Sequence, residues 1–201
     1  GFKSMHLCPR CETTLSNFEV TQGYKELTEI SAYVKFRLIS EANTFMIAWT
    51  TTPWTLPGNV ALAVHPERDY VFIEITASNA KEIPAGDTFI VGAKEEILRR
   101  VFSSPDSASA KGGESFTFDR ASGVGTFLWK GEAVSFSAKR GVKGKQLVGQ
   151  TYEPVFDFYA KNSALPNRDR AWRVYGADFV TEEDGTGIVH IAPAFGEDDY
   201  Q

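Results

Sequence analysis

The chain has 201 residues, of which 42% are apolar and 23% charged, and its formal net charge is −5. This length suits one domain or two small ones, and it buries enough apolar surface to fold without disulfides. The composition excludes disorder as the main state, a disulfide scaffold, and a surface that binds nucleic acid everywhere.

No apolar run approaches the roughly 18 residues of a membrane span, and no signal peptide opens the sequence. The only two cysteines are Cys8 and Cys11, which fits a reducing compartment. We therefore expect a cytoplasmic, monomeric protein with no membrane partner.

The first motif along the chain is Cys8-Pro-Arg-Cys11. This spacing lets two thiolates reach one metal ion, as in half of a tetrahedral zinc site. No second CxxC follows, so zinc binding needs ligands from outside this chain, and two free surface thiols explain the pair equally well. We assign the motif to an N-terminal segment, residues 1–30, and expect the main domain over residues 31–201.

Alternating apolar residues predict a series of short strands. The alternation is clearest over 31–39, where Ala32, Val34, Phe36 and Leu38 share one face. Further strands are expected at 45–49, 60–64, 70–76, 88–92, 126–129, 132–137, 152–158, 174–180 and 187–192. Short strands bounded by turn residues indicate a mainly β fold, and we expect a closed or partly open β-barrel core with a few peripheral α-helices.

One helix has a clear periodicity, over residues 94–102, where Ile97, Leu98 and Val101 make an apolar face. A second helix is expected to begin near Gly196, because the acidic residues that follow it favour a first turn. Residues 103–115 are small and polar and are typical of a surface loop.

The second motif is WTTTPWTLPGN, at residues 49–59. Thr50, Thr51 and Thr52 end a predicted strand, and the two prolines that follow oppose regular structure. Hydroxyls displayed from such a stiff segment can hold a polar ligand and orient a water molecule. A strand end followed by a proline turn is the simpler interpretation.

The third motif is GTGIVHIAPAFGEDDY, at residues 185–200. A glycine turn leads into a short strand that carries His190, and Pro193 and Gly196 end that strand before an acidic helix start. An imidazole and carboxylates would then meet at one corner. Taken singly, a histidine on a strand is usually structural, and acids at a helix start usually cap it.

Two groups of basic residues interrupt the acidic sequence. The first basic cluster is Lys139, Arg140, Lys143 and Lys145, and the second basic cluster is Arg168, Arg170 and Arg173, next to Trp172 and Tyr175. Basic and aromatic residues together suit a phosphate backbone with stacked bases. Ordinary solvated loops explain either cluster taken alone.

Together, the second and third motifs resemble the editing domain that is inserted in class I isoleucyl-tRNA synthetases. The opening CPRCETTLSNFEV resembles the start of the same insertion, so the likeness runs from about residue 5 to the end. Thr-Thr-Pro-Trp at residues 51–54 favours the isoleucyl branch, because Thr-Thr-Arg-Pro is expected in the valyl and leucyl relatives. The HIGH-type and KMSKS-type signatures of the synthetic, ATP-binding site are absent, so the chain resembles an excised editing domain.

The resemblance implies hydrolysis of valine wrongly esterified to isoleucine tRNA, with valyl-adenylate as a further substrate. A methylene in an apolar pocket is worth only about 1–3 kcal/mol, a limit for which this synthetase is itself the usual example. A second pocket must therefore accept the smaller side chain. The implied partners are the acceptor end of tRNA(Ile) carrying valine and the remainder of the parent synthetase, and editing needs no cofactor.

The resemblance also implies roles for individual residues. Asp199 matches the aspartate that binds the substrate ammonium, and His190 matches the histidine that excludes the extra methylene of isoleucine. Thr50, Thr51 and Thr52 hold the terminal adenosine and ester and orient the water. Asn59 matches a further polar position, Trp49 and Trp54 are expected to shape the pocket from behind, and the two basic clusters are expected to contact tRNA.

Three alternatives stay open at this point: a non-catalytic module that binds the tRNA acceptor end, the editing domain of the valyl branch, and a zinc-stabilised structural domain. No side chain in the motifs is an evident strong general base. We therefore expect catalysis by positioning and electrostatics, helped by the substrate's own ribose hydroxyl.

Overall fold

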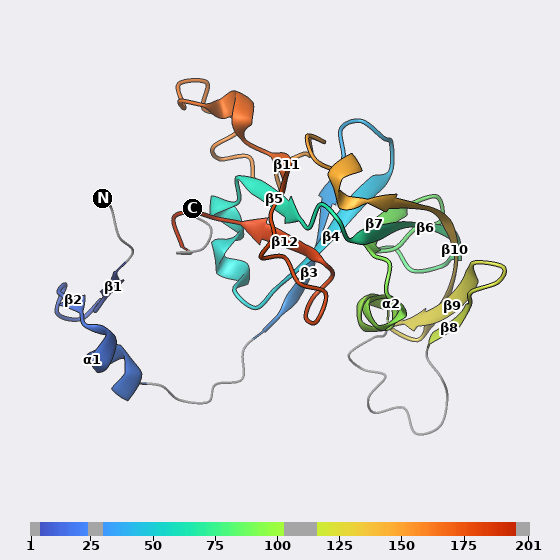
Figure 1. The fold of residues 1–201 in the computed structure, drawn as a ribbon, viewed down its shortest axis with the longest axis horizontal. Coiled ribbons are helices and arrows are strands. Elements are labelled where there is room, and N and C mark those ends of the chain that lie inside the picture. Colours follow the sequence, from blue (N-terminus) through green and yellow to red (C-terminus); the bar gives the residue numbers. More distant parts are fainter. Residues whose placement is uncertain (1–4, 24–29, 103–115, 196–201) are drawn as a thin grey trace.

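The computed structural model describes residues 5–23, 30–102 and 116–195. Figure 1 shows two β-sheets that form the body of this part, with a small third sheet near the N-terminus. The strands are β1 (His6–Leu7), β2 (Thr14–Leu15), β3 (Ala32–Arg37), β4 (Thr44–Thr50), β5 (Ala61–Val64), β6 (Asp69–Ser78), β7 (Thr88–Gly92), β8 (Phe116–Asp119), β9 (Val124–Trp129), β10 (Glu132–Lys143), β11 (Arg173–Gly176) and β12 (Ile188–Ile191). The α-helices are α1 (Asn17–Gln22) and α2 (Glu95–Phe102), and the short 3-10 helices are η1 (Pro53–Gly58), η3 (Gly144–Gln146) and η4 (Arg168–Arg170). None of the described helices is long and apolar enough to cross a membrane.

The larger sheet has seven strands in the order β3-β4-β7-β6-β10-β9-β8. Only β4 and β7 pair in parallel, and the other neighbours are antiparallel. Two register shifts interrupt the pairing of β10 with β6, and such bulges bend a strand and increase its twist. Helix α2 packs its apolar side, including Leu98 and Phe102, on the same core as Phe127 and Phe136.

The smaller sheet has the order β11-β5-β12, with β5 at its centre. All four residues of β5 are buried, which explains why its sequence, ALAV, is apolar throughout instead of alternating. Strand β12 lies against β4 of the larger sheet. Side chains of both sheets, among them Phe36 of β3 and Leu62 of β5, therefore share one core, which also contains Tyr152.

The mainly β fold with few helices is confirmed, but the expected β-barrel is wrong. In the part of the chain that the structure describes, β3 and β8 end the larger sheet, and no strand pairing joins them. The chain leaves the larger sheet at Thr50, turns through η1, and enters a separate sheet at β5. Closure of a barrel depends on strand tilt and stagger, and the alternation of apolar residues does not report either.

Most predicted strands and the helix over 94–102 are present within a few residues of their expected bounds. The strand predicted at 152–158 is wrong, because only Thr151 and Tyr152 form isolated bridges and Pro154 then lacks a backbone donor. The strand predicted at 174–180 ends at Gly176. The loop at 103–115 and the helix expected near Gly196 lie outside the described residues.

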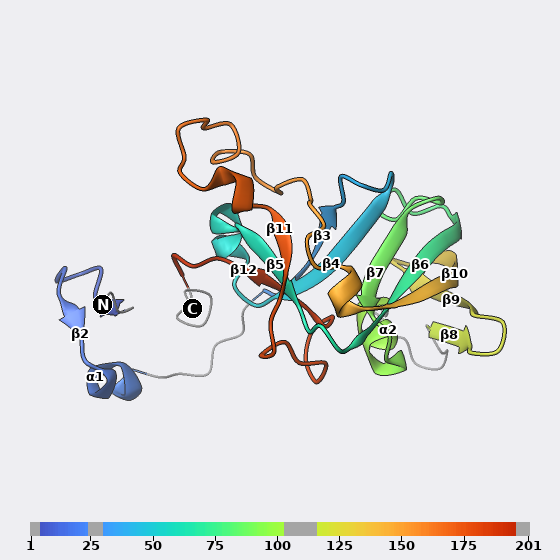
Figure 2. The same ribbon diagram turned by 45° about the horizontal axis from the view of Figure 1, so that its top comes forward.

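The N-terminal part contains a helix that the sequence motifs did not predict. Ser16 accepts a hydrogen bond from the backbone of Glu19, and the Glu19 carboxylate accepts one from the Ser16 backbone, which is a complete capping box for α1. In both views, β1, β2 and α1 lie apart from the two larger sheets (Figures 1 and 2). The domain boundary at residue 30 stays a prediction.

Candidate functional site

The second and third sequence motifs line one cavity of about 340 Å³. One wall is formed by residues 49–52 and Thr55, where β4 runs into η1. The opposite wall is formed by residues 184–190, which turn into β12, with Thr181, Ala192 and Phe195 at its edges. Small-ligand pockets span about 300–1,000 Å³, so this cavity lies at the small end of that range.

The threonine wall is a hydrogen-bonded chain of hydroxyl groups. Thr51 and Thr52 connect β4 to η1, which begins at Pro53, and the turn brings Thr55 back over Thr52. The Thr52 hydroxyl lies 3.3 Å from those of both Thr50 and Thr55, and the Thr52 backbone donates to the Thr50 hydroxyl at 3.1 Å. Thr50 and Thr55 are buried, whereas Thr51 is exposed at the cavity. The wall therefore presents polar groups in fixed positions.

His190 joins the threonine wall to the opposite wall. Its Nε2 lies 3.0 Å from the Thr55 hydroxyl, and its Nδ1 lies 3.5 Å from the Asn59 amide nitrogen. Because an amide nitrogen only donates, Nδ1 is the acceptor in this contact, which leaves Nε2 to donate. The Thr55 hydroxyl is free to accept from Nε2, since its own proton is donated to the Thr52 carbonyl at 2.7 Å. The ring is thereby fixed on both sides.

Asn59 is held in turn by Tyr152. The Tyr152 hydroxyl donates to Asn59 Oδ1 at 2.7 Å, and Asn59 Nδ2 donates to the Ala61 carbonyl at 2.8 Å. Together these bonds fix which end of the amide faces His190. Burial raises the pKa of the Tyr152 phenol well above its usual value, against a smaller opposing effect of the bond to Asn59, so the hydroxyl remains a donor.

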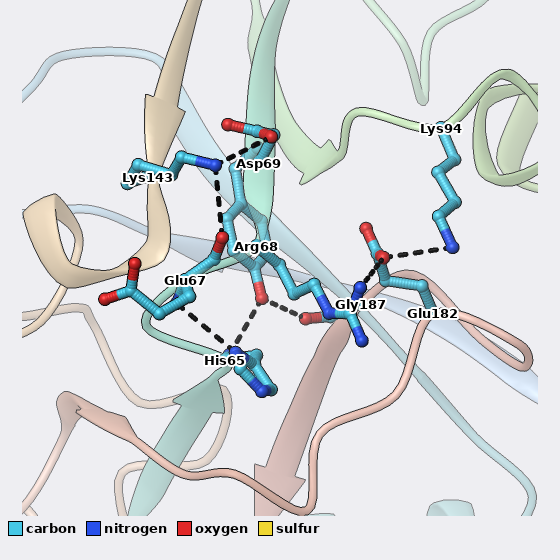
Figure 3. Close-up of polar contacts among 9 residues, drawn as sticks. His65, Glu67, Arg68, Asp69, Lys94, Lys143, Glu182 and Gly187 are labelled. Atoms are coloured by element: carbon cyan, nitrogen blue, oxygen red, sulfur yellow. Dashed lines mark hydrogen bonds and ion pairs between the residues drawn. The ribbon is translucent and has the colours of Figure 1, made fainter.

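The opposite wall is a glycine turn anchored from behind. Gly185 and Gly187 have φ angles of +70° and +76°, a region that side chains disfavour. The Thr186 carbonyl accepts from the Gly92 backbone at 2.8 Å, and the Gly187 carbonyl accepts from the Tyr70 hydroxyl at 2.7 Å. Figure 3 shows this bond beside the one that the His65 backbone donates to Tyr70. Mainly through burial, the pKa of Tyr70 is raised to about 12.

An ion-pair group holds the start of the same wall. The Glu182 carboxylate is 7% exposed and lies 3.1 Å from Lys94 Nζ and 3.5 Å from Arg68 Nη1, as drawn in Figure 3. The two cations come from the segment before β6 and from the residue before α2. Residues next to β6 and α2 thus hold the segment that leads into the cavity wall and β12.

The structure brings together some of the predicted site residues but not all of them. Thr50, Thr51, Thr52, His190 and Trp49 line the cavity. Asn59 lies behind His190 and does not line it, and Trp54 is 57% exposed and does not reach it. Asp199 lies outside the described residues, so its role stays a prediction.

Sequence reasoning missed Thr55, Tyr152 and Asp184, which the structure places in the network or on the wall. Thr55 had a local signal, because residues three apart fall on one side of a 3-10 turn. Asp184 directly precedes the third motif, so its neighbourhood in the sequence was the signal. Tyr152 had none, since only the tertiary fold brings it to the site.

The first basic cluster is paired with acidic residues. Lys139, Arg140, Lys143 and Lys145 each have a carboxylate oxygen within 3.7 Å, from Glu74, Glu41, Asp69 and Glu67 respectively. Such exposed pairs add little stability, but they cancel the positive charge of the cluster.

Two members of the second basic cluster donate hydrogen bonds to backbone carbonyls instead. Arg168 donates to the Ala160 carbonyl, and Arg173 Nε donates to the Asp169 carbonyl at 2.9 Å. Arg168 also lines a second cavity, of about 370 Å³, with Pro57 and Trp172. Phe195 borders both cavities, so Arg168 of the second basic cluster lies close to the first cavity, which the threonine segment and His190 line.

Cys8 and Cys11 are free thiols. Hydrogen bonding to the Cys11 side chain, and then to the backbone of residues 10 and 11, lowers the pKa of the Cys8 thiol. Within residues 5–23, 30–102 and 116–195, no group of three histidine, cysteine or acidic side chains could hold a metal ion. Zinc binding by the pair stays a prediction, because a tetrahedral site needs two further ligands from outside this chain.

Comparison with known proteins gives close relatives over the whole chain. The chain is 41% identical over 200 residues to the isoleucine–tRNA ligase of Chlamydia trachomatis serovar D, and 38% identical over 200 residues to the cytoplasmic isoleucine–tRNA ligase of Schizosaccharomyces pombe. Each match covers 100% of this chain, which spans about 15% of the length of these curated relatives. No family model matches the chain.

A solved structure has a similar fold at low sequence identity. The editing domain of the P. knowlesi cytosolic leucyl-tRNA synthetase aligns with a TM-score of 0.51 and 14% identity, over 85% of this chain and 60% of that chain. At this level of identity, the likeness concerns the fold.

Proposed function

We propose that this chain, which is homologous over its whole length to one segment of isoleucyl-tRNA synthetases, is an editing domain that hydrolyses mischarged aminoacyl-tRNA. The observation that carries the proposal is the cavity in which the threonine segment and His190 meet. The substrate is valine esterified to the terminal adenosine of tRNA(Ile). The tRNA body binds to the rest of the synthetase, and zinc at Cys8 and Cys11 would need ligands from there as well.

The reaction is the attack of water on the carbonyl carbon of the ester. The bond from that carbon to the ribose oxygen breaks, the ribose oxygen takes a proton, and valine leaves as the free acid. A threonine hydroxyl accepts a hydrogen bond from water and donates one to a carbonyl oxygen, so Thr51 and Thr52 can hold both reactants. Their fixed positions lower the barrier because less freedom is lost at the moment of reaction.

His190 acts here as a wall and a support. Both ring nitrogens already take part in hydrogen bonds to the protein, at 3.0 Å and 3.5 Å, so the ring is held in place. A fixed wall is what steric exclusion requires, because a movable ring would yield to one extra methylene. The neighbouring ribose hydroxyl of the substrate relays the proton to the leaving oxygen, and Asp199 holds the substrate ammonium.

The proposal is tested by release of valine from Val-tRNA(Ile) at high protein concentration, with Ile-tRNA(Ile) as the cognate comparison. We expect release of valine and not of isoleucine. Thr52→Val should lower the rate by at least tenfold, because it removes a hydroxyl from the cavity wall and keeps the shape. Thr117→Val is the matched control, since the Thr117 hydroxyl bonds to Thr126 on an exposed strand pair outside the cavity.

Two results would contradict the proposal. Retention of tRNA without release of valine would indicate a binding module and no enzyme. Equal activity of Asp199→Ala and the parent chain would remove Asp199 from the site.

A further inference from the structure

Arg100 binds the backbone of the glycine wall, the cavity wall formed by residues 184–190. It lies in the last turn of α2, and its Nη1 donates to the Gly185 carbonyl at 2.8 Å. Its Nη2 donates to the Glu183 carbonyl, also at 2.8 Å. These two carbonyls belong to the residues on either side of Asp184, so one guanidinium fixes the backbone before and after that residue.

The backbone of Arg100 is held in place because helix α2 packs on the core. Ile97 and Val101, on the same helix, are buried in the core of the larger sheet. The backbone carbonyl of Arg100 also accepts a hydrogen bond from the Tyr33 hydroxyl at 3.2 Å. A guanidinium presents its donors in a planar fork, and a lysine ammonium in its place could not hold both carbonyls with the same geometry.

Asp184 lies between the two carbonyls that Arg100 binds, and it lines the cavity. It is an exposed residue of the cavity lining and is followed by Gly185, which has a left-handed backbone that glycine adopts without steric cost. In the part of the chain that the structure describes, its carboxylate has no hydrogen-bond or ion-pair partner. The backbone of Asp184 is therefore fixed, while its carboxylate oxygens remain available to accept hydrogen bonds at the mouth of the cavity.

We propose that Asp184 is a substrate-binding residue that accepts a hydrogen bond from the free ribose hydroxyl of the terminal nucleoside, and that Arg100 is its positioning residue. The proposal rests on the proposed function, because it takes the cavity as the site of an aminoacyl ester. The amino acid occupies the deeper end beside His190, so the sugar lies at the mouth. A carboxylate is a suitable acceptor for a ribose hydroxyl, as in dinucleotide-binding sites.

The test is calorimetric binding of two mimics to the full chain. The first is a valyl-adenosine with an amide in place of the ester and the neighbouring ribose hydroxyl free. The second is the same molecule without that hydroxyl. The variants are Asp184→Asn, Arg100→Gln, Arg100→Lys and the double variant Asp184→Asn/Arg100→Gln. Arg99→Gln is the matched control, since Arg99 is the preceding residue but pairs with Glu95 on the surface.

We expect Asp184→Asn and Arg100→Gln each to weaken the first mimic about tenfold, the loss of a charge-assisted hydrogen bond. The double variant should bind the first mimic no more weakly than the single variant with the lower affinity. Arg100→Lys should also bind it more weakly than wild type. Wild type should bind the second mimic about tenfold more weakly than the first. The Asp184 and Arg100 variants should bind the second mimic with the same affinity as wild type. Arg99→Gln should bind both mimics as wild type does.

Additive losses in the double variant would overturn the link between Arg100 and Asp184. Equal losses on both mimics would overturn the role of the ribose hydroxyl. If the wild-type chain binds neither mimic and releases no valine from Val-tRNA(Ile), the proposed function fails together with this inference. If it binds both equally well, only the inference fails.

Discussion

Replacing Tyr152 with phenylalanine removes one buried hydroxyl and leaves the ring in place. That hydroxyl donates to Asn59 Oδ1 at 2.7 Å, and the two residues are only 1% and 5% exposed. The ring packs edge-on against Phe36 with a centroid distance of 5.4 Å, a contact that phenylalanine keeps. The change therefore isolates one hydrogen bond and leaves a buried amide oxygen without its donor.

An unpaired buried acceptor costs about 1–3 kcal/mol of stability. For a domain of this size, each kcal/mol lowers the melting temperature by about 2–4 °C. Urea unfolding and thermal melting of Tyr152→Phe measure the loss. We also expect weaker selection against isoleucine, since Asn59 can then rotate its amide and no longer fixes the ring of His190.

Tyr175→Phe is the matched control. The Tyr175 hydroxyl donates to the Arg170 carbonyl at 2.6 Å, but the residue is 42% exposed, so water replaces the lost bond. We expect a change below about 0.5 kcal/mol for this variant. Equal losses for the two variants would refute the reasoning that the bond from Tyr152 to Asn59 supports the site.

Three further predictions follow from packing and charge. A Cβ at residue 144 would lie 2.1 Å from the His65 carbonyl oxygen, so Gly144→Ala should cost about 1–3 kcal/mol in urea unfolding. Burial raises the pKa of Tyr70 from 10 to about 12, so its contribution to stability is present below pH 10 and is lost as the pH rises towards 12. In Tyr70→Phe, the free energy of unfolding should therefore depend less on pH over that range. Because its charges are paired, neutralising the first basic cluster should change the salt dependence of tRNA binding less than neutralising the second basic cluster, as filter binding would show.

Much of the fold could be predicted from the sequence because burial leaves a periodic trace. In β3, the even-numbered residues from 32 to 36 are more buried than their neighbours, which is the alternation that the sequence shows. The helix over 94–102 was equally visible, since four residues of α2 on one side are buried. The barrel and the strand at 152–158 failed because strand pairing over long distances leaves no such trace.

The candidate site could be predicted only in its local parts. The threonines of residues 50–52 and His190 were recognised within their own motifs. The partners that hold them come from far away in the sequence: Thr55 and His190 are 135 positions apart, and Asn59 and Tyr152 are 93 positions apart. Nothing in the spacing of a single sequence indicates contacts of this kind.

The central claim is that the aminoacyl ester binds between the threonine wall and the glycine wall. A crystal of the chain soaked with the non-hydrolysable valyl-adenosine tests this most directly. We predict electron density for the valyl group against His190, with the amide carbonyl beside Thr51 and Thr52. Density only in the second cavity, beside Pro57 and Trp172, would contradict the account.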